Sequence, residues 1–521
     1  MTSTGESPRP RRRLTAGIVG LAIAGLLGVV WLLLPPTGSD LSAQVAHADF
    51  ARDHLWTPVD LRWFGGTGWL SYSVLVPPLM AAVGVRVVGA VATAASAGLL
   101  GLLLSRCRVP RPRAGAAVGA LCLAANLMVG RLAFAVGAAA ALVTLLAATW
   151  QHRSRWLVLA AGPLVAWAAS PLAALFLGVA AAALVLQGRG LRREGGVLGA
   201  AVLVALAASA WLGQGGYMPA PVGRGLAGMT ACVLLMVVTR YRLVRVGALL
   251  AAAGIVLAVT LRTPVGMNAL RLPELFAPAL AVATSRLPMR WVVPAVVAAV
   301  CWLPPLTSDD ITAIGEPSNA SSYYGELISE LERLPLSGRV EIPPTLQRWE
   351  AVYVADRVPL ARGWMTQLDD GYNSLFFDGV VDASSYRRWL RANAVQYVAV
   401  SDAATAEAGR AETALVDRGL PFLDRVWAGR HWTVYRVVPA GSIVIGARLV
   451  SQDAASVTFR VDGARTVLAH VRWSRWLTLA GPGGCLRREG TWTAVVVQRP
   501  GTYRLGSALA PGREHRECTA T

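Results

Sequence analysis

A succession of apolar segments fills the first 305 residues and constrains the fold of this chain more than any other feature. The 521 residues are 55% hydrophobic and only 15% charged, with a mean hydropathy of +0.49, which excludes an ordinary soluble protein. Segments shorter than the ~20 residues of a straight crossing are expected to be tilted, broken or re-entrant. We predict about eleven membrane helices, at roughly 14–34, 87–104, 114–129, 132–150, 156–169, 172–187, 196–213, 225–239, 246–261, 272–285 and 291–305.

The arginines indicate which ends of these helices face the cytoplasm. All 49 basic residues are Arg, mostly in short loops, so the net charge of +19 fits the positive-inside rule better than a nucleic-acid partner. The loops that we expect inside hold 18 Arg, against seven in the outside segments before residue 306. We therefore expect a multi-pass plasma (inner) membrane protein with a retained first helix and a cytoplasmic N-terminus. An odd helix number places everything after about residue 305 outside.

Composition divides the chain into three parts. Residues 1–305 form the predicted membrane core, with a first outer loop at 37–86 whose end, from about 71, is expected to be interfacial or re-entrant. Residues 306–440 alternate strand-like and helical patterns, which predicts an extracytoplasmic α/β domain. Residues 441–521 contain short strands with Gly-rich turns, which predicts a β-sandwich-like domain. Cys485 and Cys518 lie in this last part and can form a disulfide if it is extracytoplasmic.

The first outer loop is rich in acidic and imidazole groups directly after the first apolar segment. Asp40 follows the segment, and Asp49 and Asp53 are spaced to share one helix face. These carboxylates are candidates for catalysis. An equally good explanation is that Asp40 caps a short helix and that Asp49 and Asp53 lie on its solvated face. His47 and His54 add a weak candidate site for a divalent metal, because their spacing matches no strong metal motif.

Arginines in the other outer loops suggest an anion site. Arg131, Arg262 and Arg271 are candidates for binding a phosphate, although arginines at helix ends also extend toward lipid headgroups. A carboxylate that takes a proton from a hydroxyl, beside arginines that stabilise a departing phosphate, suits glycosyl transfer from a lipid-phosphate sugar. We find no nucleotide-binding Gly-rich loop on the cytoplasmic side.

The stretch DLSAQVAHADFARDH…WFGGTGWLSYSVLVPPLMAAVG, together with VGRLAFAVG, ASPLAALFLG and TPVGMNALRL, resembles large actinobacterial membrane proteins of the GT-C glycosyltransferase superfamily. The resemblance implies a polyprenyl-phosphate sugar donor and a first-loop carboxylate base. By position Asp40 matches that base best, with Asp49 and Asp53 as second choices. The loop lacks the adjacent acid pair of some members, so dependence on a divalent metal stays open, and no cofactor is certain.

Residues 361–379 offer a candidate acceptor site in the outer part. Trp364 can stack on a sugar, and Asp369 and Asp370, near Gln367 and Asn373, can bond its hydroxyls. The competing interpretation is a turn at Asp370-Gly371 with a buried Trp.

The sequence thus favours an inverting polytopic glycosyltransferase that acts on the outer face, with Asp40 as base and an envelope glycan or glycolipid as acceptor. Membrane lipids are its other expected partners. Two alternatives stay open. One is a transporter or flippase for an envelope lipid or glycan, and the other is a non-catalytic assembly protein with a degenerate GT-C core.

Overall fold

The computed structural model describes residues 10–188, 190–378, 381–509 and 517–518, and it divides into two compact units. The first comprises the described residues up to Gln44 together with Tyr72–Ile314. The second comprises Val45–Ser71 and the described residues from Gly315 onward. Part of the predicted first outer loop therefore packs with the C-terminal half of the chain.

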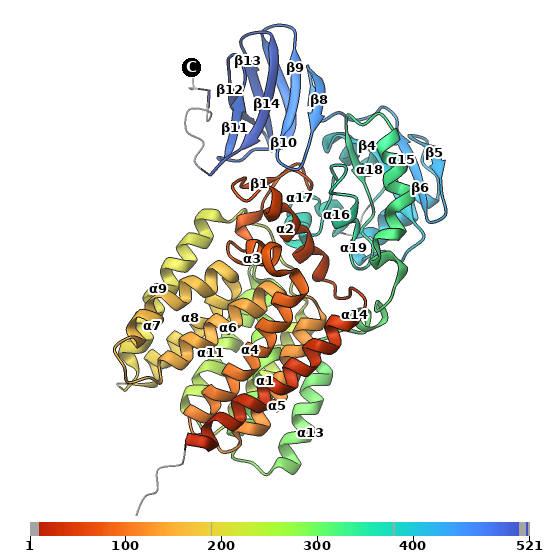
Figure 1. The fold of residues 1–521 in the computed structure, drawn as a ribbon. Helices are drawn as coiled ribbons and strands as arrows, with labels where there is room; N and C mark the ends of the chain where they lie inside the picture. The colour runs from red at the N-terminus through yellow and green to blue at the C-terminus, as the bar shows by residue number, and fades with distance from the viewer. Residues whose placement is uncertain (1–9, 189, 379–380, 510–516, 519–521) are drawn as a thin grey trace, which may run out of the picture. The chain divides into compact units, whose positions relative to one another are not determined.

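Every apolar segment predicted from the sequence is helical in the first unit (Figure 1). The helices are α1 (Pro10–Leu33), α4 (Val85–Arg106), α5 (Pro112–Met128), α6 (Leu132–Ala147), α7 (Arg155–Ala169), α8 (Pro171–Gln187), α9 (Arg192–Leu212), α10 (Val222–Val238), α11 (Arg242–Thr260), α12 (Arg271–Thr284) and α13 (Met289–Trp302). Among the described residues, four helices, α1, α4, α9 and α11, are long and apolar enough to cross a membrane by length and composition. The predicted helices are therefore confirmed as helices, whereas eleven crossings of the membrane stay a prediction.

Small residues allow the neighbouring helices α1 and α4 to approach backbone to backbone (Figure 1). A Cβ added at Gly20 would lie 2.3 Å from the carbonyl oxygen of Ala97, and one at Gly101 would lie 2.3 Å from that of Ala16. Membrane helices lack a hydrophobic driving force between them, so such close van der Waals contact is a main source of their association.

Short elements connect the long helices. α2 (Leu41–Asp53) follows α1. α3 (Val76–Val83) has Pro77-Pro78 in its first turn, and Gly84, whose φ is +105°, follows its last residue. The eight residues of α3 are too few to cross a bilayer, in line with the interfacial or re-entrant piece expected there. η2 (Gly266–Leu270) precedes α12, and α14 (Ser308–Thr312) follows α13.

The second unit contains a mixed four-stranded sheet in the order β3-β4-β6-β5. β3 and β4 are parallel, and the other two pairs are antiparallel. The strands are β3 (Arg339–Glu341), β4 (Val395–Ser401), β5 (Leu423–Ala428) and β6 (Trp432–Val437), with α15 (Gly325–Arg333), α16 (Glu350–Tyr353), α17 (Thr366–Tyr372), α18 (Ala383–Ala392) and α19 (Glu407–Asp417). This part of the unit is therefore an α/β arrangement, and the domain bounds 306–440 stay a prediction.

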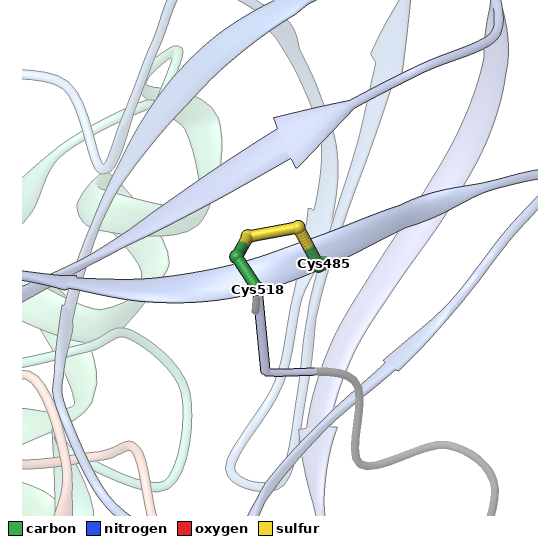
Figure 2. The surroundings of a disulfide bond; sticks show 2 residues. All are labelled: Cys485 and Cys518. Carbon is green, nitrogen blue, oxygen red and sulfur yellow. A yellow bond between two sulfur atoms is a disulfide. The ribbon is translucent and has the colours of Figure 1, made fainter. Parts of the chain in front are cut away.

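A β-sandwich follows in the same unit, and its separation as a domain of its own stays a prediction. Its sheets have the orders β12-β13-β10-β7 and β11-β14-β9-β8, and both contribute to one apolar core. Cys485 and Cys518 form a disulfide with a Cα–Cα distance of 5.0 Å (Figure 2). The strands are β7 (Val444–Ile445), β8 (Arg448–Gln452), β9 (Val457–Val461), β10 (Arg465–Arg472), β11 (Leu477–Ala480), β12 (Gly484–Glu489), β13 (Trp492–Val497) and β14 (Gly501–Ser507).

The middle of the first loop is built into this second unit. It forms the hairpin β1 (Val59–Asp60) and β2 (Thr67–Gly68). The Leu61 amide donates to the Ala454 carbonyl at 2.8 Å, and the Leu360 amide donates to the Arg62 carbonyl at 2.8 Å. These bonds join segments about 300 to 400 residues apart in sequence, which periodicity cannot predict.

Candidate functional site

Two glycines bring the segment before α2 against the turn between α5 and α6. Gly38 has φ +114°, and a Cβ there would lie 2.5 Å from the Met128 carbonyl oxygen. Gly130 has φ +84°, and a Cβ there would lie 2.5 Å from the Leu41 nitrogen. Only glycine fits both the conformation and the space. The approach lets the Asp40 amide donate to the Val129 carbonyl at 2.9 Å, which fixes Asp40 beside Arg131.

Four charged side chains meet at this point, and we call them the Asp40 ion cluster: Asp40, Arg131, Arg271 and Glu274. Oδ2 of Asp40 lies 3.4 Å from Nε of Arg131 and 3.5 Å from Nη2 of Arg271. Nη1 of Arg131 lies 3.9 Å from Oε2 of Glu274. The Asp40 side chain is 17% exposed, so the cluster is half-buried yet reachable from solvent.

A phenol lies next to the cluster. Gln44 donates a short hydrogen bond from Nε2 to the hydroxyl oxygen of Tyr72. Burial, and after it the negative charge of Asp40, raises the pKa of Tyr72 to about 12. The Tyr72 hydroxyl therefore stays protonated at neutral pH and can act as a hydrogen-bond donor.

An apolar cavity of about 520 Å³, partly open to the surroundings, lies within the same unit and is lined mainly by α4, α6, α8, α10, α11 and α12. Its wall includes Phe134 and Leu272, and the Arg271 guanidinium lies 5.8 Å from the Phe134 ring centroid. The cavity begins next to the ion cluster and follows α12 from Leu272 to Thr284, about 18 Å at 1.5 Å per residue. The arrangement suits an amphipathic ligand with an anionic head and a long apolar tail.

The structure brings together three of the residues predicted for catalysis and phosphate binding: Asp40, Arg131 and Arg271. Arg262 is exposed and lies 4.7 Å from the ring centroid of Tyr217. In the second unit Asp49 pairs with Arg52 at 2.9 Å, and burial raises the pKa of its carboxyl. Asp53 is exposed.

The two first-loop histidines each lie beside an aromatic ring. His47 is fully buried, with its ring 5.6 Å from that of Trp63, and burial lowers its pKa to about 4. The His54 ring lies 5.1 Å from that of Phe50. Within the described ranges, no three His, Cys, Asp or Glu side chains are grouped so that they can hold a metal ion.

The residues predicted for acceptor binding lie in or near the core of the second unit. Asp369 is fully buried and accepts hydrogen bonds from Arg362 at 2.9 and 2.7 Å. Arg362 also contacts Glu412 at 3.1 Å and Glu341 at 3.8 Å. Asp370 is buried too, and Trp364 is half-buried, with its carbonyl accepting from Arg348 at 3.0 Å. Asp369 therefore belongs to a buried ion-pair network instead of facing solvent.

Sequence reasoning missed Glu274. It is an acidic residue three positions after Arg271 in an otherwise apolar helix, and its side chain is only 6% exposed. An ionisable residue within an apolar helix is by itself a signal for a functional site, and this signal could have identified it.

The fold and the site together define a polytopic helical membrane protein with a C-terminal α/β and β-sandwich region. No family model matches the chain, and no curated protein matches it. Among solved structures it is similar to arabinofuranosyltransferase AftD from Mycobacteria, at 14% identity and a TM-score of 0.41. That match covers 96% of this chain and 57% of AftD, so the chain spans little more than half of AftD.

The chain is also similar to ArnT from Cupriavidus metallidurans, solved with bound undecaprenyl phosphate, at 14% identity and a TM-score of 0.45. This second match covers 80% of the chain and 97% of ArnT. Because both TM-scores lie below 0.5, we base the functional proposal on the ion cluster and the cavity.

Proposed function

We propose that this chain is a membrane glycosyltransferase that moves a sugar from a polyprenyl-phosphate donor to an envelope glycan or glycolipid on the outer face of the plasma membrane. The observation that carries the proposal is the contact of Asp40 with Arg131 and Arg271 beside the 520 Å³ apolar cavity. A base, two cations for a phosphate and an apolar space for a lipid tail are the parts that this reaction needs.

The phosphate and the lipid tail of the donor would bind in two adjacent places. Its phosphate would contact Arg131 and Arg271, whose planar guanidinium groups present paired N–H donors suited to phosphate oxygens. The first part of its isoprenoid tail would follow α12 in the cavity, whose wall is mostly Ala, Leu, Val and Phe. Arg262, which stacks on Tyr217, is not assigned to the phosphate.

The reaction would be a single displacement. The acceptor hydroxyl oxygen attacks the anomeric carbon while Asp40 takes its proton, and the bond between that carbon and the phosphate oxygen breaks. The polyprenyl phosphate leaves as an anion, and Arg131 and Arg271 stabilise the charge that develops on it. One displacement without a covalent intermediate inverts the anomeric centre.

The residues around Asp40 do not suit a divalent cation. Two guanidinium groups lie within 3.5 Å of its Oδ2, and their charge opposes a second cation at the same oxygen. A resident metal is therefore not part of the proposal, and no step depends on one.

A complementation experiment tests the proposal in the cell. The gene is deleted, and wild type, Asp40→Asn and the control Asp309→Asn are compared at matched membrane abundance. Asp309 is an exposed carboxylate of the same unit, at the start of α14. We expect wild type and the control to restore the missing envelope glycan, and Asp40→Asn to leave it absent. Full rescue by Asp40→Asn would overturn the catalytic role and favour an assembly or transport protein.

A further inference from the structure

We infer that Asp40 occupies the donor-phosphate position as an internal counter-anion, so that the donor must displace it from Arg131 and Arg271 before Asp40 can act as a base. This inference rests on the proposed function. It adds an order of events to it: the donor binds first, and its binding releases the base.

The first support is the geometry of the ion pairs. The same oxygen of Asp40 faces both arginines, at 3.4 and 3.5 Å. Charge-assisted hydrogen bonds are normally about 2.7–2.9 Å long, so these pairs are loose. A phosphate offers several oxygens and can engage each guanidinium separately, which a single carboxylate oxygen cannot do.

The second support is the charge balance of the cluster. Among the described residues, the salt bridges of the cluster join two arginines to two carboxylates, Asp40 and Glu274. Exchanging the Asp40 carboxylate for a donor phosphate keeps an anion beside both cations. Arriving phosphate therefore replaces one counter-anion by another and leaves neither guanidinium unpaired.

Glu274 has a separate part in this exchange, as a positioning residue. It lies 3.9 Å from Nη1 of Arg131, a different nitrogen from the Nε that faces Asp40. Glu274 is the more buried carboxylate, at 6% exposed against 17% for Asp40. When Asp40 leaves, Glu274 would remain as a counter-charge 3.9 Å from Arg131, and the Phe134 ring would still lie beside Arg271.

The release of Asp40 has a functional consequence. While Oδ2 faces both cations, the Asp40 side chain is held in the place that we assign to the donor phosphate and not beside an acceptor hydroxyl. Once phosphate holds the arginines, the carboxylate is free to accept a hydrogen bond from that hydroxyl. Proton abstraction would thus be confined to the enzyme that already holds its donor.

The test is an affinity measurement on the full-length protein in nanodiscs, with undecaprenyl phosphate as the probe and undecaprenol as its uncharged analogue. If Asp40 competes with phosphate, Asp40→Asn binds undecaprenyl phosphate more tightly than wild type, by roughly two- to fivefold, as expected for removal of a partly exposed ion pair. Arg271→Gln binds it at least tenfold more weakly, Glu274→Gln is also weaker, and Asp309→Asn equals wild type. The affinity for undecaprenol should not change in Asp40→Asn.

Two results would contradict the inference in different ways. If wild type binds the phosphate but Asp40→Asn binds it equally or more weakly, Asp40 does not compete and the donor-first order is wrong, whereas the proposed function stands. If wild type shows no preference for the phosphate over undecaprenol, the proposed function fails along with the inference. Asp40→Ser, measured in parallel, keeps the test decisive should the Asn variant not fold.

Discussion

Glu412 is a single residue that should make the free energy of unfolding depend on pH. It is fully buried in the Arg362 network, and burial raises the pKa of its carboxyl from 4.5 to about 7. The folded state thus holds a proton that the unfolded state releases, and the free energy of unfolding falls as pH rises from 4.5 to 7. The loss is up to about 3 kcal/mol for one carboxyl.

Thermal unfolding of the full chain between pH 5 and 8 measures this effect. Glu412→Gln should lose the part of the pH slope that Glu412 causes, while the exposed Glu332→Gln should keep the wild-type slope. The buried histidines titrate alike in all three proteins, so their contribution cancels in the comparison. Equal slopes for wild type and Glu412→Gln would contradict the prediction.

Arg362 gives a second prediction at this scale. It is the one cation within salt-bridge distance of Asp369, Glu412 and Glu341 among the described residues. Arg362→Met leaves these buried carboxylates without a counter-charge, and we expect a loss of about 3–5 kcal/mol in the free energy of unfolding. Arg357→Met, at an exposed arginine, serves as the control. Chemical denaturation distinguishes the two, and a loss below about 1 kcal/mol in Arg362→Met would contradict the account.

Single residues were predictable where an ionisable side chain stands at the end of an apolar run. That signal identified Asp40, Arg131 and Arg271, which the structure brings together. The same signal also marked Arg262, which stacks on Tyr217. The partner of each arginine is set by tertiary contacts, such as that between Arg271 and Asp40, which are 231 positions apart. The sequence alone therefore could not distinguish the arginines that contact Asp40 from Arg262.

At the scale of elements, the turn between α5 and α6 should control the site through Gly130. Alanine at Gly130 would require a positive φ and place its Cβ 2.5 Å from the Leu41 nitrogen, so the turn must move away from Asp40. We expect Gly130→Ala to lower glycan complementation at least tenfold while the protein accumulates normally. Gly223→Ala, in α10 and with nothing within 4 Å of the added Cβ, should complement fully. Full activity in Gly130→Ala would show that the glycine contact does not position Asp40.

Elements differ in how far the sequence predicts them. The apolar helices follow from hydropathy, because an apolar run of this length has few other stable states in a bilayer. The hairpin of β1 and β2 does not follow from hydropathy, since the residues next to its four strand residues bond to distant segments of the same unit. Single-sequence periodicity cannot detect pairing at such separations.

For the whole molecule, the disulfide between Cys485 and Cys518 tests the predicted placement of the C-terminal region. If that region is outside, both thiols should be oxidised in the cell and should react with maleimide only after reduction. The bond spans a sequence separation of 33 residues, and closing such a loop stabilises the fold by about 3–4 kcal/mol in the chain-entropy model. Labelling of both cysteines in untreated cells would contradict the outside placement.

The most direct test of the central claim is the conversion of the lipid itself. Purified full-length protein in nanodiscs is incubated with a lipid extract from the envelope of its deletion strain, and polyprenyl phosphate and its glycosylated form are measured by mass spectrometry. We predict that wild type and Asp309→Asn consume a polyprenyl-phosphate sugar and release polyprenyl phosphate as a glycosylated acceptor accumulates. Asp40→Asn should lower that rate at least a hundredfold. Equal conversion by Asp40→Asn, or no conversion by wild type, would contradict the assignment of the Asp40 ion cluster as the catalytic site of a glycosyltransferase.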